Sequence, residues 1–146
     1  SFYAEHRLRP MAERAALDSA TAEDVAAVAD RCAAGDFDDD DQPCRLHGDL
    51  WSGNAYATVE GVPVIIDPAV FRGDGEVDLA MTELFGGFGQ RFYEAYDATR
   101  PISREYEAFR RDLYQLYYLL VHVNLFGASY ESDALAAASR VVDALG

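Results

Sequence analysis

The sequence predicts a mostly α-helical fold with one small antiparallel β-hairpin. Apolar residues recur at helical spacing over most of the chain, whereas they follow a strand pattern only in the segment 55–67. Half of the 146 residues are hydrophobic. A chain of this length buries roughly two-thirds of its unfolded surface in one core. This excludes a disordered chain, and we expect a single domain over residues 1–146.

The N-terminal third is expected to form two helices and a loop. Apolar spacing predicts a helix over residues 2–16, with Pro10 at a kink or a restart. The Thr-Ala-Glu-Asp sequence that begins at Thr21 has the form of a capping box. It predicts that Thr21 caps a second helix, which Gly35 ends. Residues 36–43 then form an acidic loop.

The hairpin follows this loop. AYATVE alternates in hydrophobicity, VPVIID is a short β-branched run, and Glu60-Gly61 between them suits a turn. Residues 67–75 contain Pro68, Gly73 and Gly75, so we expect a loop there. The rest is helical, with predicted helices over 76–85, 88–98, 104–126 and 132–145. The longest of them ends at Gly127. We expect its buried stripe to contain Tyr106, Phe109, Leu113, Leu116, Tyr117, Leu120 and Val123.

The charge is strongly acidic. There are 26 Asp and Glu against 12 basic residues, all of them Arg, and the formal net charge is −14. Such a field repels nucleic-acid phosphates and anionic lipid headgroups, so binding to nucleic acid or to a membrane surface is disfavoured. A phosphate ligand would need a bound metal cation or a local Arg. A high-salt habitat and a GC-rich genome would both produce excess Asp without Lys, and the sequence leaves the two open.

Cysteine usage and hydropathy indicate a cytoplasmic protein. Cys32 and Cys44 are separated by eleven residues, which fits neither a metal knuckle nor a disulfide framework, so we expect free thiols in a reducing compartment. The first ten residues lack the apolar region of a signal peptide. The most apolar window, 113–126, is too short to span a bilayer and contains polar side chains.

Polar residues flank the predicted hairpin. His47, Asp49 and Asn54 precede it in the pattern H-x-D-x-x-x-x-N, and Asp67 follows its second strand. Because a hairpin brings its two ends together, we expect Asp49, Asn54 and Asp67 to converge. Phosphoryl transfer needs such a set: one carboxylate accepts the proton of the acceptor hydroxyl, while an Asn oxygen and a second carboxylate hold magnesium on the nucleotide phosphates. A lone His-x-Asp would indicate only a capped turn, so the hypothesis depends on the whole set.

The segments around these residues resemble a known family. HGDLWSGN, IDPAVFRGDGEVDLAMTELFGGF and the opening FYAEHRLRP are similar to the fructosamine kinase (ketosamine kinase) family, within the aminoglycoside-phosphotransferase-like, protein-kinase-like superfamily. Aminoglycoside, choline and homoserine kinases share the HGD…N and Asp-Pro elements. The Trp51-Ser52 pair, YEAY at 93–96 and RRDLYQLYYLLVHVNLFG are typical of the narrower family. The resemblance covers nearly the whole chain and implies the C-terminal lobe of the kinase-like fold.

The resemblance implies a role for each of these residues. Asp49 matches the catalytic base, and Asn54 and Asp67 match the residues that hold Mg²⁺ and thereby ATP. Trp51 is expected to line the sugar pocket. The implied reaction transfers the γ-phosphate of ATP to the 3-hydroxyl of a ketoamine sugar on an amine or a protein lysine, which is a step of protein deglycation.

Two further residues are expected to support the catalytic loop. His47 is expected to pack within the loop, because the residue two positions later already matches the base. Asp78 is a candidate third metal ligand. The superfamily pattern instead implies that it accepts hydrogen bonds from backbone amides of the loop.

One departure from the family pattern concerns ATP. Kinases of this fold hold ATP with a separate N-terminal β-rich lobe that contributes a Lys, and this chain has neither room for that lobe nor any Lys. We therefore expect the catalytic and substrate-binding lobe alone, inactive as an isolated chain and able to self-associate through the surface where the other lobe would dock. Two alternatives stay open: a kinase for another amine-bearing acceptor, and a non-catalytic ligand-binding module that binds no magnesium nucleotide.

Overall fold

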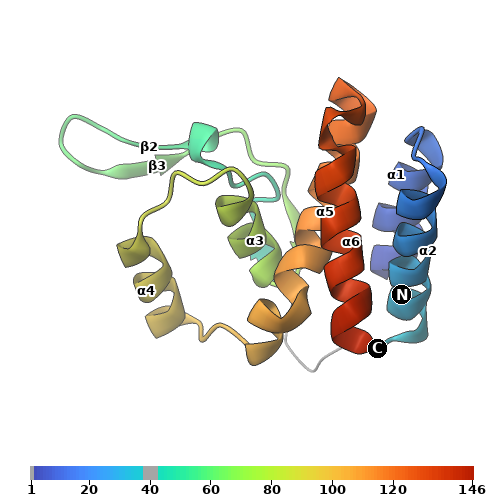
Figure 1. Ribbon diagram of the computed structural model, residues 1–146. Coiled ribbons are helices and arrows are strands. Elements are labelled where there is room, and N and C mark those ends of the chain that lie inside the picture. Colours follow the sequence, from blue (N-terminus) through green and yellow to red (C-terminus); the bar gives the residue numbers. More distant parts are fainter. Residues whose placement is uncertain (1, 38–42) are drawn as a thin grey trace. The chain divides into compact units, whose positions relative to one another are not determined.

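The computed structural model describes residues 2–37 and 43–146, which divide into two compact units. The first unit comprises residues 1–40 and 108–146, and the second comprises residues 41–107. Helices dominate, and the strands are short and antiparallel, so the predicted fold class is confirmed (Figure 1). Most of the acidic loop predicted at 36–43 lies outside the described residues.

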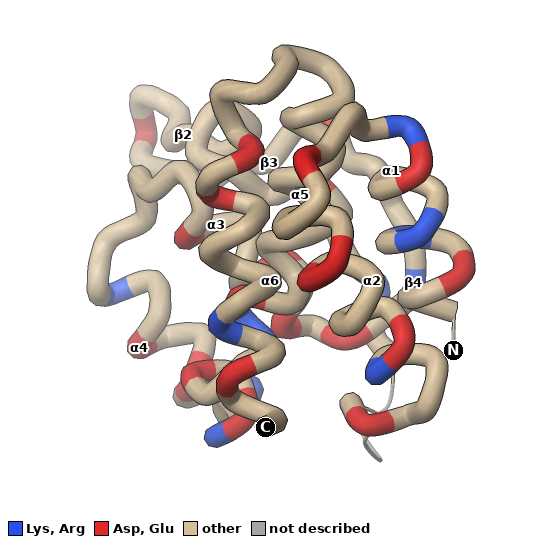
Figure 2. Tube along the Cα trace, turned by 45° about the vertical axis from the view of Figure 1, so that its right-hand side comes forward, with Lys and Arg blue, Asp and Glu red and all other residues tan. Residues whose placement is uncertain are grey.

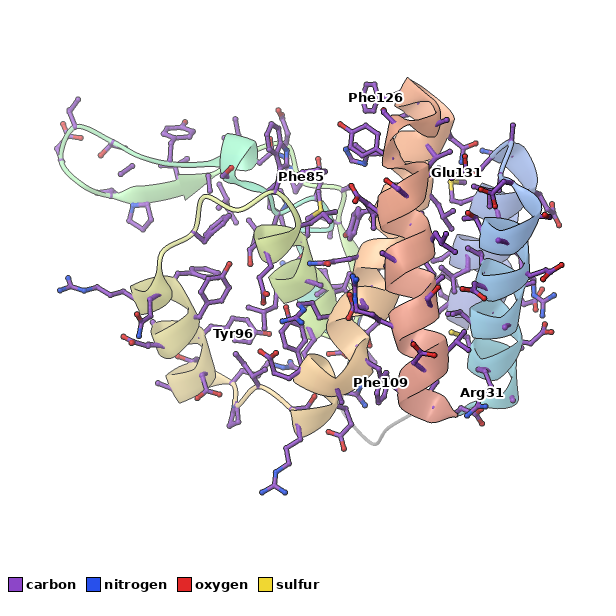
Figure 3. All side chains as sticks on the ribbon, in the orientation of Figure 1. Arg31, Phe85, Tyr96, Phe109, Phe126 and Glu131 are labelled. Atoms are coloured by element: carbon purple, nitrogen blue, oxygen red, sulfur yellow. The ribbon has the colours of Figure 1, made fainter. Side chains whose placement is uncertain are left out.

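The first unit is built from helices joined by short loops in its described residues, without strands. Helix α6 packs against both α5 and α2, and fully buried alanines on α6 let the helix backbones approach closely. Glu131 and Arg31 mark the two ends of the α2–α6 pair (Figure 3). The Asp18 amide donates to the Glu131 carboxylate at 2.5 Å, and the Arg31 guanidinium donates to the Leu145 carbonyl at 3.1 Å. The helical elements of this unit are η1 (Ala4–Leu8), α1 (Arg9–Arg14), α2 (Ser19–Ala34), α5 (Arg111–Phe126), η4 (Ala128–Tyr130) and α6 (Glu131–Leu145).

The start of α2 corrects one prediction. Asp18, not Thr21, is the N-cap, because its carboxylate accepts the Thr21 amide at 2.8 Å. Asp is at least as good a cap as Thr, and its position three residues before a free amide gives it the same geometry. Thr21 is buried in the first turn, and Gly35 ends the helix with φ 88° as predicted.

The longest helical stretch begins at Arg104 and ends at Gly127, whose φ is 87°, as the sequence predicts. A π-helical turn, η3 (Tyr106–Arg110), precedes α5. Five residues of the predicted stripe are buried, namely Tyr106, Leu113, Leu116, Leu120 and Val123, whereas Phe109 and Tyr117 are only half-buried. The core also contains Tyr114, Tyr118 and Leu119, because α5 packs against α1 and η1 as well as α6.

The second unit contains the predicted hairpin. Strand β2 (Ala55–Ala57) pairs antiparallel with β3 (Pro63–Ile65), and Tyr56 lies opposite Val64. The turn closes with a hydrogen bond from the Thr58 amide to the Val62 carbonyl at 2.9 Å. Tyr56 and Ile65 lie on opposite faces of this ribbon, and both are exposed.

A second pair of strands was missed. Strand β1 (Cys44–Leu46) pairs antiparallel with β4 (Phe71–Gly73), so part of the loop expected at 67–75 is a strand. Pro68 and the two glycines indicated a loop, but Pro68 precedes the strand and Gly73 ends it opposite Cys44. This pair encloses the hairpin in sequence, so the segments 47–54 and 66–70 both run between the two strand pairs.

Helices α3 (Glu76–Leu84) and α4 (Gln90–Thr99) complete the second unit, close to their predicted ranges. The buried Glu76 carboxylate anchors the start of α3, since it accepts the Ser103 amide at 2.7 Å and the Ser103 hydroxyl at 3.0 Å.

The excess of acidic residues and the state of the two cysteines agree with the sequence predictions. Acidic residues outnumber basic ones along the described trace (Figure 2). Cys32 is buried and Cys44 half-buried, and both are free thiols. Within the described residues, no helix has the length and hydropathy needed to cross a bilayer.

Candidate active site

The candidate site is built on the two segments between the strand pairs, and Ile66 joins them. Its amide donates to the Asn54 carbonyl at 3.0 Å, which extends the β2–β3 ladder by one residue. Its carbonyl lies 2.9 Å from Nε2 of His47. Because Ile66 is held on both sides, the position of Asp67, the next residue, is fixed relative to the loop that contains Asp49.

Asp49 and Asn54 contact each other directly. The Nδ2 group of Asn54 donates to the Asp49 carboxylate at 3.1 Å and to the Asp49 carbonyl at 3.0 Å. The 3₁₀ turn η2 (Ser52–Asn54) brings the two residues together, and the Asn54 amide donates to the Trp51 carbonyl at 3.0 Å. Asn54 is buried and Asp49 half-buried. Since its nitrogen is committed to Asp49, Asn54 has its Oδ1 oxygen left for a ligand.

Asp78, in the first turn of α3, accepts two backbone amides of the same loop. The His47 amide donates to its carboxylate at 2.6 Å and the Gly48 amide at 2.8 Å. Burial raises the pKa of Asp78, while the hydrogen bonds from Gly48 and His47 act in the opposite direction. Both carboxylate oxygens are used by the loop, so this geometry favours a supporting role over direct metal ligation.

Asp67 has an unusual backbone. Its φ is 52°, and among the described residues it is the only one other than glycine with a positive φ. Its side chain is exposed at the end of the hairpin. A left-handed non-glycine residue costs about 1 kcal/mol or more and is often found where function requires it.

The side chains present suit magnesium. An Asn oxygen and a carboxylate are hard oxygen ligands, and Mg²⁺ takes one or two protein ligands and completes its shell with water and phosphate. Among the described residues, no group of three or more His, Cys, Asp and Glu is gathered as a metal site.

Trp51 lies between Asp49 and Asn54 in sequence, and the residue is 39% exposed. Its amide donates to the Asp49 carbonyl at 3.1 Å, so the indole projects from a fixed point of the loop. The sequence did not indicate that Ile66 would be a partner of His47, because every residue has a carbonyl and the contact joins residues nineteen apart.

The arrangement and the sequence both match a known family. The fructosamine kinase family model matches residues 1–144. The chain belongs to this family. A crystal structure from Thermobifida fusca, described as that of a fructosamine-3-kinase, superposes with a TM-score of 0.87 at 39% identity, and covers 97% of this chain and 50% of that one. The fold is therefore that of the fructosamine kinases.

Other members of the family are similar over shorter parts of their length. A probable ketoamine kinase of Synechocystis is 46% identical over 133 residues, which are 91% of this chain and 45% of that protein. A chloroplastic protein-ribulosamine 3-kinase of Arabidopsis thaliana is 50% identical over 95 residues, 65% of this chain and 28% of that protein. This chain thus spans about half the length of the fructosamine kinase relatives it matches, or less.

Proposed function

We propose that this chain is the catalytic and substrate-binding lobe of a kinase that phosphorylates ketoamine sugars with ATP. The hydrogen-bonded pair Asp49–Asn54 is the observation on which the proposal depends. The bond from the Ile66 amide to the Asn54 carbonyl, one residue before Asp67, supports the inclusion of Asp67 in the same site. The names of the relatives, ketoamine kinase and protein-ribulosamine 3-kinase, support the ketoamine as acceptor. A cytoplasmic location and a role in protein deglycation are further parts of the proposal.

Asp49 would act as the base. Asn54 occupies one oxygen of its carboxylate, so the other is free to accept the proton of the sugar 3-hydroxyl. The hydroxyl oxygen forms a bond to the γ-phosphorus while the bond to ADP breaks, its proton passes to Asp49 late in this step, and Asp49 afterwards releases the proton to solvent. In a loose phosphoryl-transfer transition state the proton leaves late, so the position of Asp49 matters more than its basicity.

Asn54 and Asp67 would hold Mg²⁺ on the nucleotide. The ion would neutralise charge on the phosphates, which a chain of net charge −14 otherwise repels. The Asn54 side chain is held by Asp49, so the base and the metal ligand are oriented by one pair of hydrogen bonds. Asp78 would keep the loop in place through the His47 and Gly48 amides.

The test is turnover by the polypeptide encoded by the complete reading frame that contains this sequence. We expect ADP release with fructosyl-lysine or ribulosyl-lysine. Asp49→Asn keeps an oxygen acceptor for Asn54 but removes the base, so kcat should fall at least about 100-fold with an unchanged melting temperature. Glu60→Gln in the hairpin turn is the matched control and should retain activity. Full activity of Asp49→Asn would exclude Asp49 as the base.

The alternatives give different results in the same assay. Turnover of an aminoglycoside or choline without turnover of either ketoamine would favour a kinase for another amine-bearing acceptor. An absence of magnesium-dependent nucleotide binding in the complete polypeptide would favour a non-catalytic module. The isolated 146-residue chain, which has no Lys, should show no turnover.

The proposed partners are a small ketoamine or a glycated amine or protein and, for the isolated chain, a second copy. The hairpin and the segment after it expose large apolar side chains, which can drive self-association. These are Tyr56, Val59, Val62, Ile65, Ile66 and Val70. Analytical ultracentrifugation should detect oligomers that dissociate when Val59 and Ile65 are replaced by Ser, and a strictly monomeric chain would exclude this partner.

A further inference from the structure

The indole ring of Trp51 lies across Gly53. A Cβ atom placed on Gly53 would be 2.2, 2.3 and 2.6 Å from the Cη2, Cζ2 and Cζ3 atoms of Trp51. Contacts under 3.0 Å are essentially never seen, so the ring occupies space that a side chain at residue 53 would need. The φ of Gly53 is not positive, so its backbone conformation does not require glycine. The absence of a side chain at residue 53 therefore makes room for the Trp51 ring.

The surrounding backbone leaves only the ring free to move. The Trp51 amide and carbonyl are both bonded within the loop, to the Asp49 carbonyl and the Asn54 amide. The Ser52 side chain lies close against Gly87, since a Cβ atom on Gly87 would be 2.4 Å from the Ser52 Cβ, so this side chain has little room to shift towards Gly87. A side chain at residue 53 would consequently displace the indole rather than the loop.

We propose that Gly53 is a positioning residue: it sets the orientation of the Trp51 indole on the loop that contains Asp49, and through the ring it sets selectivity between ketoamine acceptors. The choice of acceptor rests on the proposed function, whereas the orientation of the ring does not. A planar ring offers its apolar face to the C–H groups of a sugar. The orientation of the ring then decides which hydroxyl of the sugar reaches the Asp49 carboxylate, and small displacements of a reacting hydroxyl change rates strongly.

The first experiment measures the ring directly. Trp51 is the only tryptophan of the 146-residue chain, so the intrinsic fluorescence of this chain reports on it alone. In Gly53→Ala we expect a red-shifted emission and stronger quenching by acrylamide, with unchanged far-ultraviolet circular dichroism. Gly89→Ala is the matched control, since φ is −86° there and a Cβ atom would meet nothing within 4 Å. An emission spectrum of Gly53→Ala identical to that of the parent would overturn the proposal.

A second variant tests the proposal if Gly53→Ala does not fold. If Gly53→Ala fails to fold, the double variant Trp51→Ala/Gly53→Ala has no ring to displace and should fold like Trp51→Ala. If the double variant also fails to fold while Trp51→Ala folds, Gly53 has another role and the proposal is wrong.

The second experiment is a double-mutant cycle in the complete polypeptide. Gly53→Ala should raise KM for fructosyl-lysine about 3- to 10-fold, the size of one aromatic contact, and change the kcat/KM ratio between fructosyl-lysine and ribulosyl-lysine. In the Trp51→Ala background the same change should add nothing, because Gly53 acts through the ring. Additive effects would overturn the proposal. A parent enzyme inactive on both ketoamines would overturn the proposed function and the acceptor part of this inference, and the fluorescence result would still decide the ring orientation.

Discussion

At the scale of single residues, Asp78 fixes the loop that contains the candidate base. Its two oxygens accept amides from consecutive residues, at 2.6 and 2.8 Å. Asp78→Asn would point an NH₂ group at one of these amides. We therefore expect the free energy of unfolding to fall by about 1–3 kcal/mol, the usual cost of an unsatisfied buried group, together with a large loss of kcat. Urea denaturation and turnover measure the two effects, with Glu60→Gln as the control.

The same variant tests the pKa of Asp78. Burial raises this pKa in the folded state, so the native protein binds the proton more tightly than the unfolded chain does. The Asp78 contribution to stability therefore falls as the pH rises from the ordinary Asp pKa of 3.8 through the raised pKa of the folded state. The free energy of unfolding of the parent, measured relative to that of Asp78→Asn, should therefore decrease as the pH rises over this range. A difference that is independent of pH would contradict the raised pKa.

Sequence alone indicated the residue types of the site, but not how they are held. Asp49, Asn54 and Asp67 were recognised because their spacing around a hairpin is local information. The contact of His47 with the Ile66 carbonyl and the position of the Trp51 ring over Gly53 depend on folded geometry, which the side-chain types do not encode.

At the scale of elements, two tyrosines of the second unit make a contrasting pair. Tyr106 donates to the Glu83 carboxylate at 2.6 Å, whereas the buried Tyr96 hydroxyl has no hydrogen-bond partner among the described residues. Figure 3 shows Tyr96 on the side of α4 that faces α3. Tyr106→Phe should lower the free energy of unfolding by about 1–3 kcal/mol, while Tyr96→Phe should leave it unchanged or raise it. Urea denaturation of both variants under the same conditions measures the two effects. Equal losses of unfolding free energy in Tyr106→Phe and Tyr96→Phe would contradict the difference in hydrogen bonding between the two hydroxyls.

The alkaline behaviour of Tyr96 follows from the same burial, which raises the pKa of Tyr96 to about 12. Between the ordinary value of 10.0 and about 12, the folded state keeps a proton that the unfolded chain has lost. Stability should therefore fall over this range, and Tyr96→Phe should reduce the fall.

The N-terminus of α2 supports a prediction on acid stability. The hydrogen bond from the Thr21 amide lowers the pKa of Asp18, so the cap contributes stability above the unfolded pKa and loses it as the pH falls through the lowered value. Asp18→Asn keeps a capping oxygen without a titrating group. It should match the parent at pH 7 and show less loss on acidification, whereas Asp18→Ala should be weaker already at pH 7. Urea denaturation followed by circular dichroism measures all three proteins, and indistinguishable acid profiles would contradict this role.

Element prediction succeeded where the determining residues are neighbours in sequence. The hairpin was predicted because Glu60-Gly61 and the flanking strands lie within one short segment. Strands β1 and β4 were missed because three residues are too few to show alternation and because Cys44 and Gly73 pair across 29 residues. The cap at Asp18 was missed because Thr21 offered an equally plausible pattern, and only the backbone conformation distinguishes them.

At the scale of the whole molecule, net charge should control stability. The net charge of −14 favours expansion by self-repulsion, and salt screens this repulsion over about 10 Å at 0.1 M. We expect the melting temperature to rise by about 2–8 °C between low salt and 0.5 M NaCl, which corresponds to about 1 kcal/mol in a chain of this size. The rise should shrink near pH 4.3, the sequence pI. A melting temperature independent of salt at pH 7 would show that repulsion is not limiting.

The left-handed backbone at Asp67 has a consequence for protein engineering. Glycine adopts such a backbone without the steric penalty that a side chain introduces. A library selected only for heat resistance would therefore favour Gly at this position and discard the carboxylate that we assign to the ion. Laboratory evolution of this protein should alternate thermal selection with a screen for product formation. Selection for stability favours Gly at position 67, whereas selection for activity favours Asp.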